Sequence, residues 1–262
     1  MFLFARRSLS APARVRPRRS GSAAMCKEPR CRVLRLPVPD GPGGAGDDWA
    51  EVIKTAAGVL QEGGVIGVPT DTIYGIACLA QHSRAIKDIY SVKGRNGEKP
   101  LAICVGAIPD IYRYCHVHVP DQLLQDLLPG PVTLVLQRSE ALSKDLNPFT
   151  PLVGVRIPNH PFIQQLAKAC SGPLALTSAN VSSQGSTLTV QEFQDLWPRL
   201  SLVVDGGPIG DGMSPECRLG STVVDLSVSG SYTVVRPGCA LIPTVKVLGE
   251  KYGLTPNLQL DA

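Results

Sequence analysis

Hydrophobic residues along the chain alternate between helical spacing and short apolar runs. Over positions 49–62 they recur every three or four residues, and the pair Gly63-Gly64 then supplies a helix stop. An apolar run at 65–68 follows directly and is ended by Pro69. This pattern predicts a helix that leads into a buried strand.

The same alternation continues through most of the chain. Helices are predicted at 83–92, 121–128, 161–169 and 189–197, the last opened by the capping box Thr189-x-x-Glu192. Strands are predicted at 101–105, 132–137, 153–157, 174–177, 202–205, 221–225 and 232–236. Strands separated by helices indicate a parallel sheet, whereas the last strands follow one another without helices and indicate antiparallel pairs. The predicted fold class is therefore α/β with a mixed sheet.

The two ends of the chain differ from this central part. Residues 1–35 carry ten Lys or Arg and a single acid, Glu28. The first two dozen residues, basic and without acids, are typical of a mitochondrial transit peptide, and Met25 is a candidate start for a second, cytoplasmic form. A basic leader without a targeting role is the alternative. Residues 36–48 are predicted to be a Pro/Gly linker, 49–240 one globular domain, and 241–262 a weakly packed tail.

Composition narrows the function classes. The formal charge of +4 resides in the basic leader, and the remainder is near neutral or slightly acidic, which argues against a nucleic-acid-binding module. No run approaches the roughly 20 apolar residues of a membrane span. The 8 cysteines form no C-x-x-C pair and have no histidine at ligand spacing, so zinc is not indicated and a reducing compartment is expected.

Standard nucleotide-binding and hydrolase motifs are missing. The sequence GPGGAG at 41–46 matches the dinucleotide fingerprint only in spelling, because it lies in the linker and is followed by Asp47 and Asp48, which repel phosphate. The chain has neither a Walker-type phosphate loop nor a G-x-S-x-G elbow. A nucleotide would therefore bind through a site of another kind.

Three polar segments lie beside predicted strands, where α/β folds present ligand-binding loops. PTDTIYG at 69–75 contains Thr70, KGR contains Lys93 and Arg95, and LTSAN contains Ser178 and Asn180. Hydroxyls and amides suit small polar substrates, and the cations suit polyphosphate. Taken singly, each segment also fits an ordinary turn or a solvated loop.

Four further residues are candidates because of their position in or beside apolar strands. Arg156 is the most informative, since a buried guanidinium needs an anionic partner, which can be a ligand. The others are Thr133, Ser221 and Arg236.

Together these segments resemble the YrdC family of threonylcarbamoyl-adenylate synthases. The match covers about residues 49–240 in the family's order: PTDTIYG, KGR, KPL, LLPGPVT, VRIP, LTSAN, GSTVVD and RPG. The paired signature Lys-x-Arg and Ser-x-Asn is present as Lys93-x-Arg95 and Ser178-x-Asn180. One departure is Cys104, near the position where some microbial members carry a histidine that lines the threonine pocket. The resemblance implies a twisted mixed sheet with flanking helices around a positively lined cavity.

The resemblance also implies an activity. Threonine, bicarbonate and ATP, the last with Mg²⁺, would give threonylcarbamoyladenylate and diphosphate for modification of adenosine 37 in ANN-decoding tRNAs. Lys93 and Arg95 would hold the phosphates, and Ser178 and Asn180 would orient threonine and nucleotide. The remaining implied contacts are Arg236 and Thr133 to ATP, and Thr70, Arg156 and Ser221 to threonine.

A labile adenylate implies hand-off to a tRNA threonylcarbamoyl transferase, with direct tRNA binding weak or absent. Both the cytoplasm and the mitochondrion are expected locations. Two other classes stay open: an RNA-binding or regulatory interaction module without catalysis, and a synthase that carbamoylates another amino acid. Release of pyrophosphate with a defined amino acid separates these classes.

Overall fold

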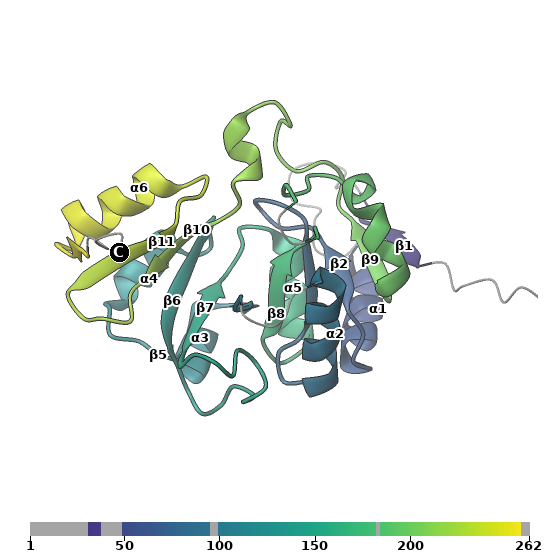
Figure 1. Cartoon of the computed structure of the whole chain (residues 1–262), viewed down its shortest axis with the longest axis horizontal. Helices are drawn as coiled ribbons and strands as arrows, with labels where there is room; N and C mark the ends of the chain where they lie inside the picture. Colours follow the sequence, from purple (N-terminus) through teal and green to yellow (C-terminus); the bar gives the residue numbers. More distant parts are fainter. Residues whose placement is uncertain (1–30, 38–48, 95–98, 182–183, 258–262) are drawn as a thin grey trace, which may run out of the picture.

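The computed structural model describes residues 31–37, 49–94, 99–181 and 184–257. Within these residues twelve strands form one twisted sheet in the order β1-β9-β2-β3-β8-β4-β7-β6-β10-β11-β12, with β5 paired to β6 (Figure 1). The strands are β1 (Arg32–Arg35), β2 (Ile66–Val68), β3 (Gly75–Leu79), β4 (Ala102–Cys104), β5 (Cys115–His116), β6 (Val132–Arg138), β7 (Leu152–Arg156), β8 (Leu174–Ser178), β9 (Leu202–Asp205), β10 (Thr222–Asp225), β11 (Ser231–Arg236) and β12 (Thr255–Pro256).

The sheet is mixed, as the sequence predicts. β9 runs parallel to β1 and β2, and β10 runs parallel to β6, whereas β3 and β8 have antiparallel neighbours on both sides. The expected antiparallel pair near the C-terminus is β10 with β11. β9 lies far from them in the strand order, because residues 206–221 cross from one end of the sheet to the other (Figure 1).

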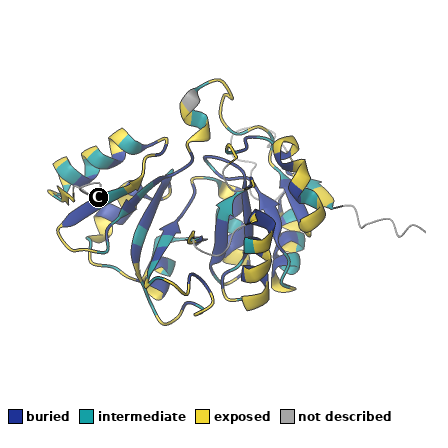
Figure 2. Ribbon diagram, viewed as in Figure 1, coloured by how far each residue is buried: buried dark blue, intermediate teal, exposed yellow. Residues whose placement is uncertain are grey.

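Helices pack against both faces of the sheet, and they bury two apolar clusters. Helices α1 (Ala50–Gln61) and α5 (Pro161–Ala169) share one cluster, and α2 (Ser83–Lys93), α3 (Ile108–Tyr114) and α4 (Asp121–Leu127) contribute to the other. Adjacent residues of β3 follow the period-2 rule of strands, since Ile76 enters one cluster and Ala77 the other. Central strands such as β2 and β3 are therefore buried on both faces, while the outer sides of the helices are exposed (Figure 2).

Helix 189–197 differs from its prediction. The segment η1 (Val190–Arg199) is a 3-10 helix with Pro198 inside it and non-helical torsion angles at Phe193. Thr189 makes no side-chain capping bond to the backbone, so the predicted capping box is wrong. The carboxylate of Glu192 accepts from the N–H of Leu188 at 3.4 Å and pairs with Arg218, whose Nη1 lies 2.6 Å from Oε2.

The ends of the folded unit also differ from the expected boundaries. β1 lies at the edge of the sheet, paired with β9, so the fold includes residues assigned to the basic segment 1–35. At the other end, α6 (Leu241–Lys246) leads into a short helical segment in which Leu248 is fully buried. In the described part of the tail 241–262, which was expected to pack weakly, Leu248 and Thr244 are buried and the other residues are half-buried or exposed.

Candidate active site

A cavity of about 530 Å³ lies against the strands from β3 to β11 and under the loop that follows β2. Its small residues Ala102 and Gly154 leave room on the sheet, and a Cβ at Gly154 would come within 3.0 Å of the Thr133 methyl group. Apolar side chains such as Ile73, Leu101 and Val223 form part of the lining. Hydroxyl and cationic side chains also line it, among them Thr70, Thr133, Ser178, Ser221, Lys99, Arg156 and Arg236. Among the lining residues that the structure describes, none carries a carboxylate.

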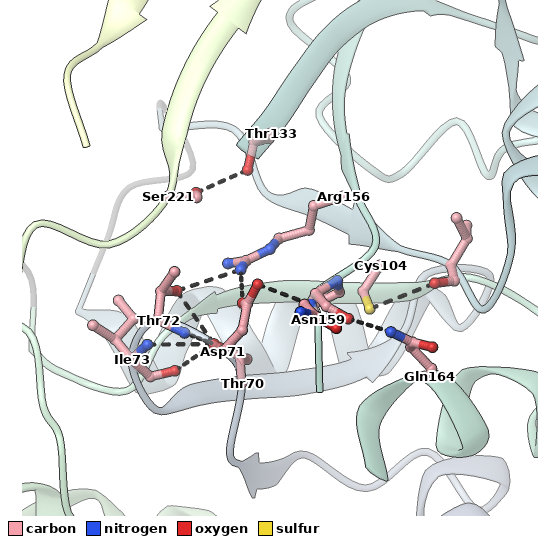
Figure 3. Close-up of polar contacts among 12 residues, drawn as sticks. Thr70, Asp71, Thr72, Ile73, Cys104, Thr133, Arg156, Asn159, Gln164 and Ser221 are labelled. Carbon is pink, nitrogen blue, oxygen red and sulfur yellow. Dashed lines mark hydrogen bonds and ion pairs between the residues drawn. The ribbon is translucent and has the colours of Figure 1, made fainter. Parts of the chain in front are cut away.

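Arg156 ends β7 and is held from behind by the loop after β2. Its Nη2 donates to Oδ1 of Asp71 at 2.6 Å and to Oγ1 of Thr72 at 3.3 Å (Figure 3). The other carboxylate oxygen of Asp71 accepts from the backbone N–H of Asn159 at 2.8 Å. The anionic partner expected for this buried guanidinium is therefore Asp71, within the chain itself. The Nε of Arg156 is buried and has no partner among the described residues.

Arg236 ends β11 at the mouth of the cavity. Its Nη2 donates to the carbonyl oxygen of Ser221 at 2.9 Å and lies 3.3 Å from the Ser221 hydroxyl. Arg236 is exposed as a residue, but its guanidinium group packs against Ser221. This desolvation, together with repulsion from the Arg156 charge, lowers the pKa of Arg236. Two like charges thus face the same cavity.

The RPG motif has a steric explanation. A Cβ on Gly238 would stand 2.3 Å from the backbone carbon of Ser221 and from the backbone nitrogen of Thr222. Only glycine permits so close an approach of two backbones. The approach fixes Ser221, whose hydroxyl lies 2.9 Å from that of Thr133 (Figure 3).

Thr70 lines the cavity and also organises its own loop. Its Oγ1 donates to the carbonyl oxygen of Ile73 at 2.7 Å and accepts from the N–H groups of Thr72 and Ile73. The turn that the sequence allows as an alternative is therefore formed (Figure 3). The loop that forms this turn therefore also forms part of the cavity wall.

Lys93, Ser178 and Asn180 form one cluster at the end of β8. The ammonium of Lys93 is fully buried and donates to the carbonyl oxygen of Ser178 at 2.7 Å, to Oδ1 of Asn180 at 3.0 Å, and to the carbonyl oxygen of Asn180. The Ser178 hydroxyl lies 3.3 Å from the same nitrogen, so both side chains of the Ser-x-Asn pair face one way, as their spacing predicts. The Asn180 amide group also holds the following loop through the carbonyl oxygens of Val181 and Gln184.

The structure thus brings six predicted residues to the cavity: Thr70, Thr133, Arg156, Ser178, Ser221 and Arg236. Lys93 and Asn180 lie behind its wall, where they contact Ser178, and Arg95 lies outside the described residues. Lys99 and Tyr74 also line the cavity, although neither is among the predicted site residues. Both belong to sequence motifs already singled out, KPL and PTDTIYG, which is the signal that points to them.

The histidines and Cys104 take no part in the lining that the structure describes. His82 caps α2 by accepting from the Ala85 N–H, and His160 stacks on Trp49 with ring centroids 6.3 Å apart. Cys104 is wholly buried, and burial raises the pKa of its thiol to about 12. It therefore behaves as a small apolar residue.

The arrangement defines an α/β protein with a cationic, hydroxyl-lined cavity suited to an anionic ligand. The family described as Telomere recombination, comprising Sua5, YciO and YrdC proteins, matches residues 58–238. Among curated relatives, the threonylcarbamoyl-AMP synthase of Homo sapiens is 60% identical over 232 residues, covering 87% of this chain and 83% of the relative. The synthase of Pyrococcus abyssi is 31% identical over 211 residues, covering 78% of this chain and 58% of the relative.

Solved structures agree with the sequence matches. Sua5 of P. abyssi complexed with L-threonine superimposes with a TM-score of 0.71 at 27% identity, covering 87% of this chain and 62% of that one. YciO of E. coli, at a TM-score of 0.66 and 24% identity, covers 80% of this chain and 95% of that one and matches in fold. The chain belongs to the YrdC/Sua5 family of threonylcarbamoyl-AMP synthases, which are nucleotidyltransferases.

Proposed function

We propose that the cavity holds ATP and L-threonine side by side and forms L-threonylcarbamoyladenylate from them and bicarbonate, with release of diphosphate. The observation that carries this proposal is a cavity of about 530 Å³ whose wall holds three cationic residues and several hydroxyl residues, and no acidic side chain among the described lining residues. Both organic substrates carry anionic groups that such a wall can bind.

The chemistry asks the protein mainly for positioning. The amine of threonine captures carbon dioxide as a carbamate, and a carbamate oxygen attacks the α-phosphorus of ATP. The bond from that phosphorus to the bridging oxygen breaks, and diphosphate leaves. Cations stabilise the charge on the phosphoryl oxygens and the leaving group, and hydroxyl groups fix the orientation of the two substrates.

We assign each site residue to ATP or to threonine from the family resemblance and from its position in the cavity. Arg236 at the cavity mouth and Thr133 serve ATP, together with Asn180 and the pair Lys93 and Arg95. Thr70, Arg156, Ser178 and Ser221 serve threonine. The unpartnered Nε of Arg156 supports its role, because it offers a buried donor to the threonine carboxylate.

The contacts of Lys93 add a second role to the phosphate contact implied by resemblance. Its ammonium holds the backbone and side chains of Ser178 and Asn180, so it positions the signature pair. Phosphate binding by Lys93 and Arg95 stays a prediction.

We propose that Mg²⁺ arrives with ATP. Over the part of the chain that the structure describes, no three His, Cys, Asp or Glu side chains are grouped to hold a metal ion. The donors at the cavity are hydroxyls and cations, which fit phosphate oxygens rather than a metal. Magnesium is commonly held by substrate phosphates and water, where it neutralises phosphate charge.

The product is proposed to pass to a tRNA threonylcarbamoyl transferase without direct tRNA binding by this chain. The basic leader supports a mitochondrial form and Met25 a cytoplasmic one, although both lie outside the described residues. No helix among the described residues is long and apolar enough to cross a membrane.

The test is release of diphosphate by the purified chain with ATP, bicarbonate and each amino acid in turn. We expect release that requires threonine and bicarbonate, and that is reduced at sub-saturating ATP in Arg236→Gln. Arg84→Gln is the matched control, because Arg84 lies on the exposed side of α2 in a loose pair with Asp88 at 3.9 Å. Absence of release with any amino acid would exclude the synthase and favour an RNA-binding or regulatory role.

A further inference from the structure

Asp71 stands directly behind Arg156, and it does not line the cavity. Its side chain is 9% exposed and that of Arg156 is 8% exposed, so the pair is closed off from solvent. The two residues come from different parts of the fold: Asp71 from the loop after β2 and Arg156 from the end of β7. Their contact therefore ties two walls of the site together.

Both oxygens of the Asp71 carboxylate are engaged. Oδ1 accepts from Nη2 of Arg156 at 2.6 Å, and Oδ2 accepts from the N–H of Asn159 at 2.8 Å (Figure 3). The backbone bond fixes the carboxylate, and the fixed carboxylate sets the direction of the guanidinium. Thr72 adds a weaker contact to the same nitrogen at 3.3 Å.

The pairing uses one side of the guanidinium and leaves another for a ligand. Nη2 takes the protein contacts, whereas Nε is buried without a partner among the described residues. A buried donor without an acceptor costs free energy, which a bound anionic group would recover. The bond from Nη2 to a fixed carboxylate oxygen, together with the Thr72 contact, holds the guanidinium and therefore its Nε in a defined direction.

We propose that Asp71 is a positioning residue that orients Arg156 so that its Nε meets the carboxylate of the amino-acid substrate. This inference rests on the proposed function, in which Arg156 serves threonine. It predicts that loss of Asp71 weakens amino-acid binding through Arg156 and leaves ATP binding, served by Arg236, near its original value.

The test is steady-state release of diphosphate by the full chain, varying threonine at saturating ATP and then ATP at saturating threonine. Asp71→Asn keeps the shape of the side chain and removes its charge. We expect the KM for threonine to rise about tenfold or more and the KM for ATP to change less than about threefold. Thr72→Val removes only the weaker contact, so it should raise the KM for threonine by a smaller factor. Asp88→Asn, on the exposed side of α2, is the matched control.

A double variant separates positioning from a merely structural role. In an Arg156→Gln background, Asp71→Asn should raise the KM for threonine no further, because the group through which it acts is gone. The melting temperature should differ between these variants. Arg156→Gln alone should lower it, because a buried carboxylate is left without its cation. Adding Asp71→Asn should raise it again, because that carboxylate is removed.

Three results would overturn the inference. The first is an unchanged KM for threonine in folded Asp71→Asn, and the second is an equal rise of the KM for threonine and the KM for ATP. The third is a fall in both KM values, which would mean that Asp71 acts only by its charge. Each requires an active wild-type chain. A wild-type chain without threonine-dependent release would instead overturn the proposed function and this inference with it.

Discussion

Replacing Lys93 with methionine tests how the end of β8 is held. The Lys93 ammonium is fully buried and bonds the backbone and side chains of Ser178 and Asn180. Methionine keeps a similar length and an apolar stem, but it removes the charge and all the donors. If Lys93 organises the Ser-x-Asn pair, the variant loses stability and activity together.

The contacts give the size of the effect. The carbonyl oxygen of Ser178 keeps a donor after the substitution, because it also accepts from the Asn180 N–H at 3.0 Å. The backbone oxygen and the Oδ1 of Asn180 both lose the Lys93 donor. A buried acceptor left unsatisfied costs about 1–3 kcal/mol, so the two together cost about 2–6 kcal/mol. At about 2–4 °C per kcal/mol for a chain of this size, that loss lowers the melting temperature by roughly 4–24 °C.

Urea unfolding and release of diphosphate measure the two effects on the same preparations. Lys87→Met is the matched control, since Lys87 is exposed on the same helix, and its free energy of unfolding should change by less than about 0.5 kcal/mol. Wild-type stability combined with a raised KM for ATP in Lys93→Met would refute the positioning role. Lys93 would then act on phosphate alone.

Three further predictions follow from named contacts. Gly238→Ala should lower the free energy of unfolding by about 2 kcal/mol or more and reduce diphosphate release, because its Cβ would stand 2.3 Å from the backbone of Ser221; urea midpoints and activity check this. Arg236→Gln should raise the KM for ATP about tenfold and leave the KM for threonine nearly unchanged in steady-state assays. Hydrogen bonding to Lys251 and Tyr252 lowers the pKa of Asp126 to about 2, so its contribution is present above about pH 4 and is lost as the pH falls toward 2; urea unfolding of Asp126→Asn should show a shallower loss across that window.

Periodicity predicted most of the sheet and its covering helices. The helix over 49–62 appears as α1, and the strand over 132–137 appears as β6, each within one residue at either end. β3 escaped prediction because its short apolar run follows directly on the polar loop PTDTIYG, whose turn signals dominate that part of the sequence. The helix in the C-terminal segment was not predicted because few residues of that segment are buried; Leu248 and Thr244 are the buried ones.

Sequence order predicted the members of the site but not their contacts. Arg156 was expected to need an anion, and its partner Asp71 lies 85 positions away in the chain. Strand register and loop direction decide such a pairing, and neither can be read from residue spacing. The burial of Lys93 was hidden for the same reason, because a lysine next to a glycine helix stop is typical of a solvated helix end.

Arg156 and Arg236 place two positive charges at the cavity, and this affects the stability of the fold. Desolvation, and after it repulsion from Arg156, lower the pKa of Arg236, and both effects cost free energy when the protein folds without a ligand. The protein offsets only part of this cost: Asp71 neutralises Arg156, whereas Arg236 contacts the neutral oxygens of Ser221. A cavity kept cationic at the expense of stability is one that a bound anion stabilises. The rigid turn at Thr70 and the close backbone contact at Gly238 hold the two cationic walls in place until that anion binds.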